Sequence, residues 1–175
     1  MAEISVPSPK PAPTAEEIDE FIAHASKNHR ADVDLFLDRW GNEFVDITSA
    51  EKHCNWTAFM IAIDWGYISL ASHLLKRGAN IDATTVRGDT ALMWAVIQGK
   101  ESHARFLLAH NASLAPVNRD GNNAVTLAMD TDGHPVEGII RAHAEKQAEN
   151  AAREIGRGTA EQVTVRRPLR LRMGM

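Results

Sequence analysis

Apolar residues recur along the middle of this chain at helical spacing, in short runs separated by polar, turn-forming residues. One run covers residues 58–65, and the next covers residues 68–77. Thr57 stands where its side-chain oxygen can cap the first run, Gly66 breaks the chain between the runs, and Gly78 closes the second. The pattern therefore predicts two short helices, with Gly78 in the left-handed conformation that glycine adopts without strain.

This pattern repeats with a fixed period of 33 residues. When residues 52–84 are set above residues 85–117, similar residues fall at that offset without a gap. A third copy starts at Asn118 and then drifts, and a weaker, earlier copy can be read backwards from Gly41. The residues that match in the two clear copies include Thr57 and Thr90, Ala62 and Ala95, Gly66 and Gly99, Leu74 and Leu107, and Ala79 and Ala112.

These residues resemble the ankyrin repeat, whose pattern places Gly-x-Thr-Pro-Leu-His-x-Ala before a glycine, a Leu-Leu pair and a Gly-Ala turn. The resemblance covers roughly residues 15–145, as about four repeats of which two are clear. It implies an all-α fold, a solenoid of stacked helix-turn-helix repeats that share one core. The chain departs from the family pattern at the proline places (Ala58, Ala91 and Ala124), at the histidine places (Met60, Met93 and Thr126), and at Asn111, which replaces the closing glycine.

The sequence divides into three parts. Residues 1–14 are Pro-rich, and we expect them to be disordered. Residues 15–155 form the repeat domain, which ends in a long capping helix packed by a stripe of alanine and isoleucine residues and stopped by Gly156 and Gly158. Residues 156–175 form a short basic tail that alternates apolar and basic residues, and we expect it to be extended or strand-like.

Charge is distributed unevenly between these parts. Residues 153–175 carry a net charge of +4, which leaves −8 for residues 1–152 of a chain with −4 overall. Because phosphate binding depends on clustered bases, the acidic body is a poor match for nucleic acid. Only the tail suits a polyanion, through Arg166, Arg167, Arg170 and Arg172.

The composition also bears on location. No apolar run approaches the roughly 18 residues of a membrane-spanning helix. Residues 1–14 lack the apolar segment of a signal peptide. The single cysteine, Cys54, cannot form an intramolecular disulfide. We therefore expect a cytoplasmic protein in a reducing compartment, without a membrane span, and a monomer rather than an oligomer.

Catalytic motifs are nearly absent from the sequence. There is no phosphate-cradling glycine loop, no nucleophile elbow and no metalloprotease helix motif. His53 and Cys54 could supply a base and a nucleophile, but adjacent residues on a loop rarely face one another. An enzyme that uses this pair is the weakest of our hypotheses.

The histidine spacing does not indicate a metal site. His24 and His29 are five residues apart, and His103 and His110 are seven apart. Two ligands on one face of a helix need a spacing of about four residues. We therefore expect no metal and no cofactor.

The resemblance implies a concave binding surface, because ankyrin repeats grip a partner, usually a protein, with their loop tips and the exposed face of each first helix. Trp56, Trp65 and Ile97 place large apolar groups at such positions, and tryptophan and arginine are typical of binding hot spots. The loop-tip positions are His53, Cys54, Trp56, Val86, Arg87, Asp89, Arg119, Asp120 and Asn122, and the helix-face positions are Asp64, Trp65, Ile97, Gln98, Asp130 and Thr131.

The remaining tryptophans, and some of the binding positions, also have a purely structural interpretation. Trp94 is expected in the core with Met60 and Met93, and Trp40 is expected as a cover on the surface. Trp65 fits a partner contact and a cover for the neighbouring repeat equally well. Arg87 and Asp89 can pair with each other across a loop tip, as an exposed salt bridge, instead of binding a partner.

The sequence thus predicts a non-catalytic protein–protein interaction module, acting as an adaptor, an inhibitor or a targeting subunit. In the alternative hypothesis the basic tail anchors the protein to nucleic acid or to an anionic surface. The enzyme hypothesis based on Cys54 and His53 is kept as a third.

Overall fold

The computed structural model describes residues 12–48, 55–130 and 134–164 of the 175-residue chain, with side chains up to residue 153 in the last helix. These residues form helices joined by turns and loops, with an isolated β-bridge between Thr48 and Thr57. The elements are α1 (Ala15–Ser26), α2 (Arg30–Trp40), the 3-10 helix η1 (Asn42–Phe44), α3 (Ala58–Asp64), α4 (Ile68–Lys76), α5 (Ala91–Ile97), α6 (Glu101–Ala109), α7 (Ala124–Met129) and α8 (Glu137–Thr164).

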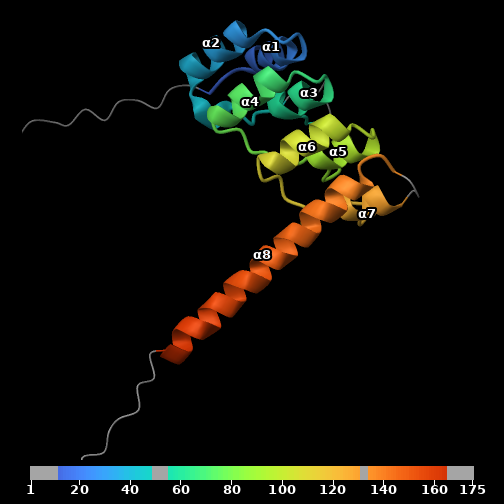
Figure 1. Ribbon diagram of the computed structural model, residues 1–175. Helices are drawn as coiled ribbons and strands as arrows, with labels where there is room; N and C mark the ends of the chain where they lie inside the picture. The colour runs from blue at the N-terminus through green and yellow to red at the C-terminus, as the bar shows by residue number, and fades with distance from the viewer. Residues whose placement is uncertain (1–11, 49–54, 131–133, 165–175) are drawn as a thin grey trace, which may run out of the picture.

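Consecutive helices form antiparallel pairs, and the pairs stack one after another along the molecule (Figure 1). The first pair is α1–α2, the second α3–α4, the third α5–α6, and α7 with α8 forms the last. Helix α1 packs on α3, α3 packs on α5, and α5 packs on α7, so the first helices of the pairs make one continuous layer. The structure confirms the all-α, solenoid-like fold that the repeat pattern predicts.

Side-chain caps define where the first helices begin. The Thr57 hydroxyl oxygen accepts a hydrogen bond from the backbone N–H of Met60 at 3.2 Å, and Thr90 does the same for Met93 at 3.3 Å. Such a cap contributes about 1 kcal/mol, because it satisfies a backbone donor that the helix cannot. The predicted cap at Thr57 is confirmed and recurs one period later.

Residues with positive φ end the helices. Gly66 and Gly99 turn the chain within the second and third pairs, with φ of 77° and 64°. Gly78 closes α4 with φ of 100°, and Asn111 closes α6 in the same way with φ of 64°. The left-handed conformation predicted at Gly78 is confirmed, and Asn111 shows that asparagine can replace glycine at this place.

Small and apolar residues fill the space between the layers. Phe59, Leu74, Leu92 and Leu107 are fully buried, and each contributes about 1.5–3 kcal/mol by leaving water. Met60 and Met93 are buried as predicted. The core is continuous through the stack, from Phe21 in α1 to Ile140 in α8.

One tryptophan differs from its prediction. Trp40 is buried rather than a surface cover, and the guanidinium carbon of Arg39 lies 4.8 Å from the centre of its ring. The reason is that Trp40 is the last residue of α2 and is followed by η1, which packs on α2.

The helical body begins before the expected boundary at residue 15. Pro13 is buried, and Thr14 forms a capping box with Glu17 at the start of α1. The backbone N–H of Thr14 donates to the Glu17 carboxylate, which holds the pKa of Glu17 below its usual value. Residues 13 and 14 therefore belong to the helical body, whereas residues 1–11 lie outside the described chain.

The last helix differs most from expectation. Helix α8 continues to Thr164 instead of ending near residue 155, so residues 156–164 are helical rather than extended. Glycine costs a helix only about 1 kcal/mol, so Gly156 and Gly158 do not end it. Residues 165–175, with Arg166, Arg167, Arg170 and Arg172, lie outside the described chain.

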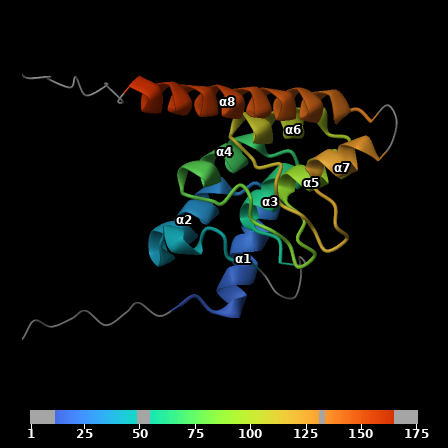
Figure 2. The same cartoon turned by 90° about the horizontal axis from the view of Figure 1, so that it is seen from below.

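The expected packing of the α8 alanine stripe is wrong beyond its first turns. Ile140 is buried, but Ala148 and Ala151 are exposed. A helix of 28 residues is about 42 Å long, three times the length of α6, so most of it has no helix beside it. Figure 1 shows α8 running well past the other helices, and Figure 2 shows it along one side of the stack. Among the described residues, we find no helix with the length and apolar character needed to cross a membrane.

Candidate functional site

A hollow of about 580 Å³ opens between the end of α3 and the loop that precedes α5. We call it the α3–α5 hollow. Aromatic and aliphatic side chains make up most of its wall, with charged groups at the edge. Its lining residues are Trp56, Ile61, Asp64, Trp65, Thr85, Val86, Arg87, Asp89 and Trp94.

Large apolar side chains are exposed at this hollow. Trp65 is 64% exposed and Val86 is 45% exposed, and both line it. Ile97, at the end of α5, is 49% exposed but is not one of the residues that line the hollow. Trp65 and Tyr67 lie nearly parallel, with ring centres 6.5 Å apart, and this contact orients the exposed indole. Three of the apolar positions inferred from the sequence are therefore accessible, as a binding surface requires.

Two further tryptophans form the inner wall. Trp56 and Trp94 are half-buried, and their ring centres lie 5.2 Å apart at an angle of 50°. Trp94 was expected in the core, but α5 presents it at the hollow instead. Its indole N–H is buried and has no hydrogen-bond partner among the described residues.

The loop before α5 is held by one threonine. The Thr85 N–H donates to the Asp89 carbonyl oxygen at 3.0 Å, and the Thr85 hydroxyl accepts from the N–H groups of Arg87 and Asp89. One period later, Asn118 makes the same pattern: its N–H donates to the Asn122 carbonyl at 2.9 Å, and its side-chain oxygen accepts from Asn122. Two successive loop tips thus share one geometry.

Adjacent tips are joined directly. The Arg119 N–H donates to the Arg87 carbonyl oxygen at 2.8 Å, and Figure 2 shows the two loops on the same side of the stack. The repeat period did predict equivalent loops, but it did not single out Thr85 and Asn118. Their separation of 33 residues was the signal that could have identified them.

The charged residues at the hollow are already paired within the protein. Arg87 donates to the Asp120 carboxylate at 2.6 Å, and this hydrogen bond raises the pKa of Arg87. The Arg87–Asp89 pair predicted from the sequence is at most a weak contact, with 4.0 Å between Nε and Oδ2. Asp120, on the next loop, is the stronger partner of Arg87.

Asp89 is not a surface residue. It is only 5% exposed, and its carboxylate accepts a hydrogen bond from the Asn118 side chain at 2.7 Å. Asp89 thus lines the hollow but offers a partner little surface, and its assignment as a partner-binding position stays a prediction. It stands at a loop tip by sequence, but its side chain turns inward and joins two loops.

Asp64 connects the ends of α3 and α5. Its carboxylate accepts from the Gln98 amide at 2.6 Å, and its backbone carbonyl accepts from the Lys100 ammonium at 2.6 Å. Gln98 and Asp64 are thus engaged with each other at the edge of the hollow.

Some of the remaining predicted binding positions are accessible to solvent, and others lie outside the described part of the chain. Arg119, Asp120 and Asp130 are exposed, and Asn122 is half-buried. His53, Cys54 and Thr131 lie outside the described residues, so their roles stay predictions.

Comparison with known proteins relates this arrangement to a repeat family. Residues 69–149 match the model of a family described as ankyrin repeats, in three copies. "Ankyrin repeat and SAM domain-containing protein 6" of Danio rerio is 35% identical over 91 residues, which is 52% of this chain and 12% of the relative. "Ankyrin repeat and KH domain-containing protein mask" of Drosophila melanogaster is 35% identical over 93 residues, 52% of this chain and 2% of the relative. The chain spans only a small part of the length of these relatives.

Proposed function

This chain contains ankyrin repeats, and from that premise we propose that it is a non-catalytic module that binds a protein partner at the α3–α5 hollow. Ankyrin repeats are general protein–protein interaction modules, and these repeats are similar to those of the two relatives. The role we assign is that of an adaptor, an inhibitor or a targeting subunit.

The exposure of Trp65 beside the hollow is the observation that carries the proposal. A tryptophan that is 64% exposed places a large apolar surface in water, and Val86 extends that surface across the opening. Tryptophans at such positions are frequent anchors of protein interfaces, because burying them excludes much water at little conformational cost.

The paired charges indicate how the partner is held. Arg87, Asp64 and Asp89 each have a partner within the protein, so a ligand gains little from contacting them. Binding then depends on apolar contacts in the hollow, which salt does not screen. We expect the affinity to change little between low and moderate salt.

The test begins with proteins captured from the native cell extract by the full chain and identified by mass spectrometry. Each recombinant candidate is then titrated calorimetrically against the wild type and Trp65→Ala. We expect the substitution to weaken binding by about 2 kcal/mol, roughly 30-fold, because it removes a buried anchor.

The matched control is Leu35→Ala, which removes a 67% exposed apolar side chain from α2, outside the hollow. This variant should bind like the wild type. Equal affinity of all three chains for every candidate would contradict the proposal.

The basic tail provides the second candidate function, because residues 165–175 carry four arginines and no acidic residue. Deleting residues 165–175 separates it from the first. Loss of strongly salt-dependent binding to a polyanion would favour the tail, and unchanged partner binding by the truncated chain would favour the hollow.

A further inference from the structure

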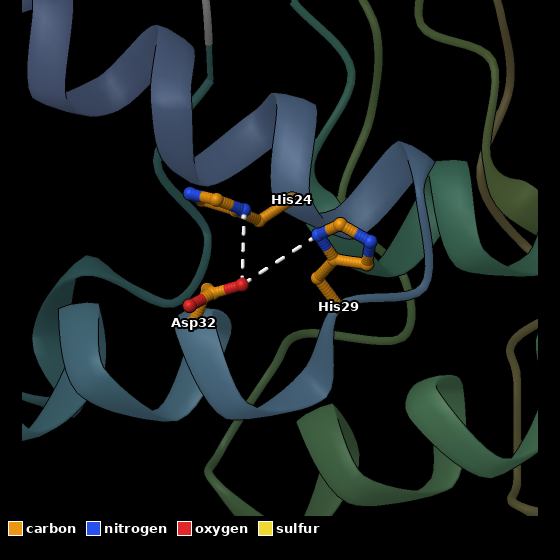
Figure 3. A group of neighbouring side chains, drawn as sticks. All are labelled: His24, His29 and Asp32. Carbon is orange, nitrogen blue, oxygen red and sulfur yellow. Dashed lines mark ion pairs between the residues drawn. The ribbon is translucent and has the colours of Figure 1, made fainter.

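Three potential metal ligands converge at the turn of the first helix pair, at the opposite end of the stack from α8. His24 lies in the last turn of α1, His29 caps the start of α2, and Asp32 lies in the first turn of α2. The Asp32 Oδ2 atom is 3.4 Å from His24 Nδ1 and 3.5 Å from His29 Nδ1. Figure 3 shows both imidazole rings directing a nitrogen toward that one oxygen.

The backbone fixes this convergence. Asn28 has φ of 58°, and its N–H donates to the Ala25 carbonyl at 3.1 Å. The His29 N–H donates to the His24 carbonyl at 2.9 Å. These two bonds form a Schellman motif, which sets the position of His29 relative to His24. A four-residue spacing applies to ligands on one helix, whereas His24 and His29 flank a turn between two helices.

One of the ligand atoms approaches Asp32 but has no hydrogen-bond partner among the described residues. Nδ1 of His24 is shielded from solvent and makes no hydrogen bond with any described residue. A buried nitrogen without a hydrogen bond has lost its hydration with nothing in its place, and a bound cation would supply the missing partner.

The second helix pair shows what the same positions hold elsewhere. The two turns can be aligned on Asn28 and Gly66, which both have positive φ. In this alignment Ala62 corresponds to His24 and Leu70 corresponds to Asp32, and both Ala62 and Leu70 are buried in the core. In the first pair, the polar replacements face one another at a surface hollow that His24 and Asp32 line together with Glu20. The outer face of a terminal repeat is usually polar, and any polar residues meet that need. This face instead brings together two imidazoles and a carboxylate.

We propose that His24, His29 and Asp32 bind a divalent cation of the zinc class. With metal–ligand bonds of about 2.0–2.2 Å, neighbouring ligand atoms in a tetrahedral site lie about 3.3–3.5 Å apart, close to both distances from Asp32. All three ligand atoms lie within 4.8 Å of one another, and a small rotation of the exposed His29 ring closes the third edge. Two neutral imidazoles and one carboxylate suit zinc better than magnesium or calcium, which prefer oxygen ligands.

The three side chains are 37–54% exposed, so water or an added ligand would complete the coordination. A metal here joins the last turn of α1 to the first turn of α2. It would therefore stabilise the terminal helix pair, because it binds the folded arrangement and not the unfolded chain. This role is independent of the α3–α5 hollow.

The test uses the full, untagged chain with Cys54→Ser, which removes the thiol as a competing ligand. Zn²⁺ is titrated against a chromophoric chelator at neutral pH, and thermal unfolding is followed with and without Zn²⁺. We expect one Zn²⁺ per chain and an upward shift of the Tm. His29→Gln, which alters the most exposed ligand, should weaken binding roughly tenfold or more and abolish the shift.

The matched control is His110→Gln, which makes the same substitution at an exposed histidine of another helix pair. It should bind Zn²⁺ like the parent. Co²⁺ adds a spectroscopic readout, because a tetrahedral site absorbs visible light strongly. The proposal is overturned if the parent binds no Zn²⁺, or if His29→Gln and His110→Gln bind it equally well. In either case the three residues form only imidazole–carboxylate ion pairs.

Discussion

The interior of the second helix pair and the rim of the α3–α5 hollow use apolar side chains for different purposes. Leu74, in α4, is 0% exposed and packs in the core, whereas Trp65, at the end of α3, is 64% exposed. The core cluster encloses the first residue, whereas the second leaves most of its side chain in solvent despite its contact with Tyr67. An apolar residue in a repeat therefore stabilises the fold or offers a contact, depending on whether a neighbour already occupies the space beside it.

The largest expected effect is on the interior. Leu74→Ala leaves a cavity in a packed layer, and we expect the free energy of unfolding to fall by about 2–5 kcal/mol. Urea titration followed by circular dichroism measures it. A loss below about 1 kcal/mol would mean that the layer collapses around the cavity or is loosely packed.

The turn between the two regions gives an intermediate effect. Gly66 has φ of 77°, and a Cβ there would meet His103 Nε2 at 3.3 Å. Gly66→Ala should lower the free energy of unfolding by about 1–2 kcal/mol, because alanine is strained in this conformation. Gly66→Asn should cost less, as the asparagines at 28 and 111 adopt the same conformation. Equal losses in the two variants would show that crowding against His103, rather than backbone strain, sets the cost.

The smallest effect concerns pH. Burial lowers the pKa of His103, with a further contribution from Lys100, while Asp64 opposes it. The fold therefore favours the neutral ring, and its contribution to stability is present above the usual histidine pKa of 6.5 and is lost as the pH falls. Between about pH 7.5 and about pH 5.5, wild type should lose more stability than His103→Gln. Urea titrations at both pH values test this, and identical losses would contradict it.

Much of the scaffold could be predicted from the sequence, because each repeat carries its own local signals. The cap at Thr57, the break at Gly66 and the closing Gly78 depend on residues a few positions apart. Local chemistry of this kind is visible in one sequence, and the period then extends it to the next repeat.

Contacts between repeats were harder to predict. Asp89 looked like a loop-tip residue, but a hydrogen bond from Asn118, 29 residues away, accounts for its burial. The full length of α8 does not follow from its glycines, because Gly156 and Gly158 weaken a helix without ending it. The cluster at His24 was missed because its ligands meet across a turn. Each of these features depends on how elements pack, which a local pattern does not specify.

The most direct measurement of the central claim compares two free energies for Trp65→Ala. One is its free energy of unfolding from urea titration, and the other is its free energy of binding to a captured partner protein. The account predicts a stability within about 0.5 kcal/mol of wild type and an affinity about 2 kcal/mol weaker. A variant that unfolds as easily as Leu74→Ala, or that binds its partner as tightly as wild type, would contradict it.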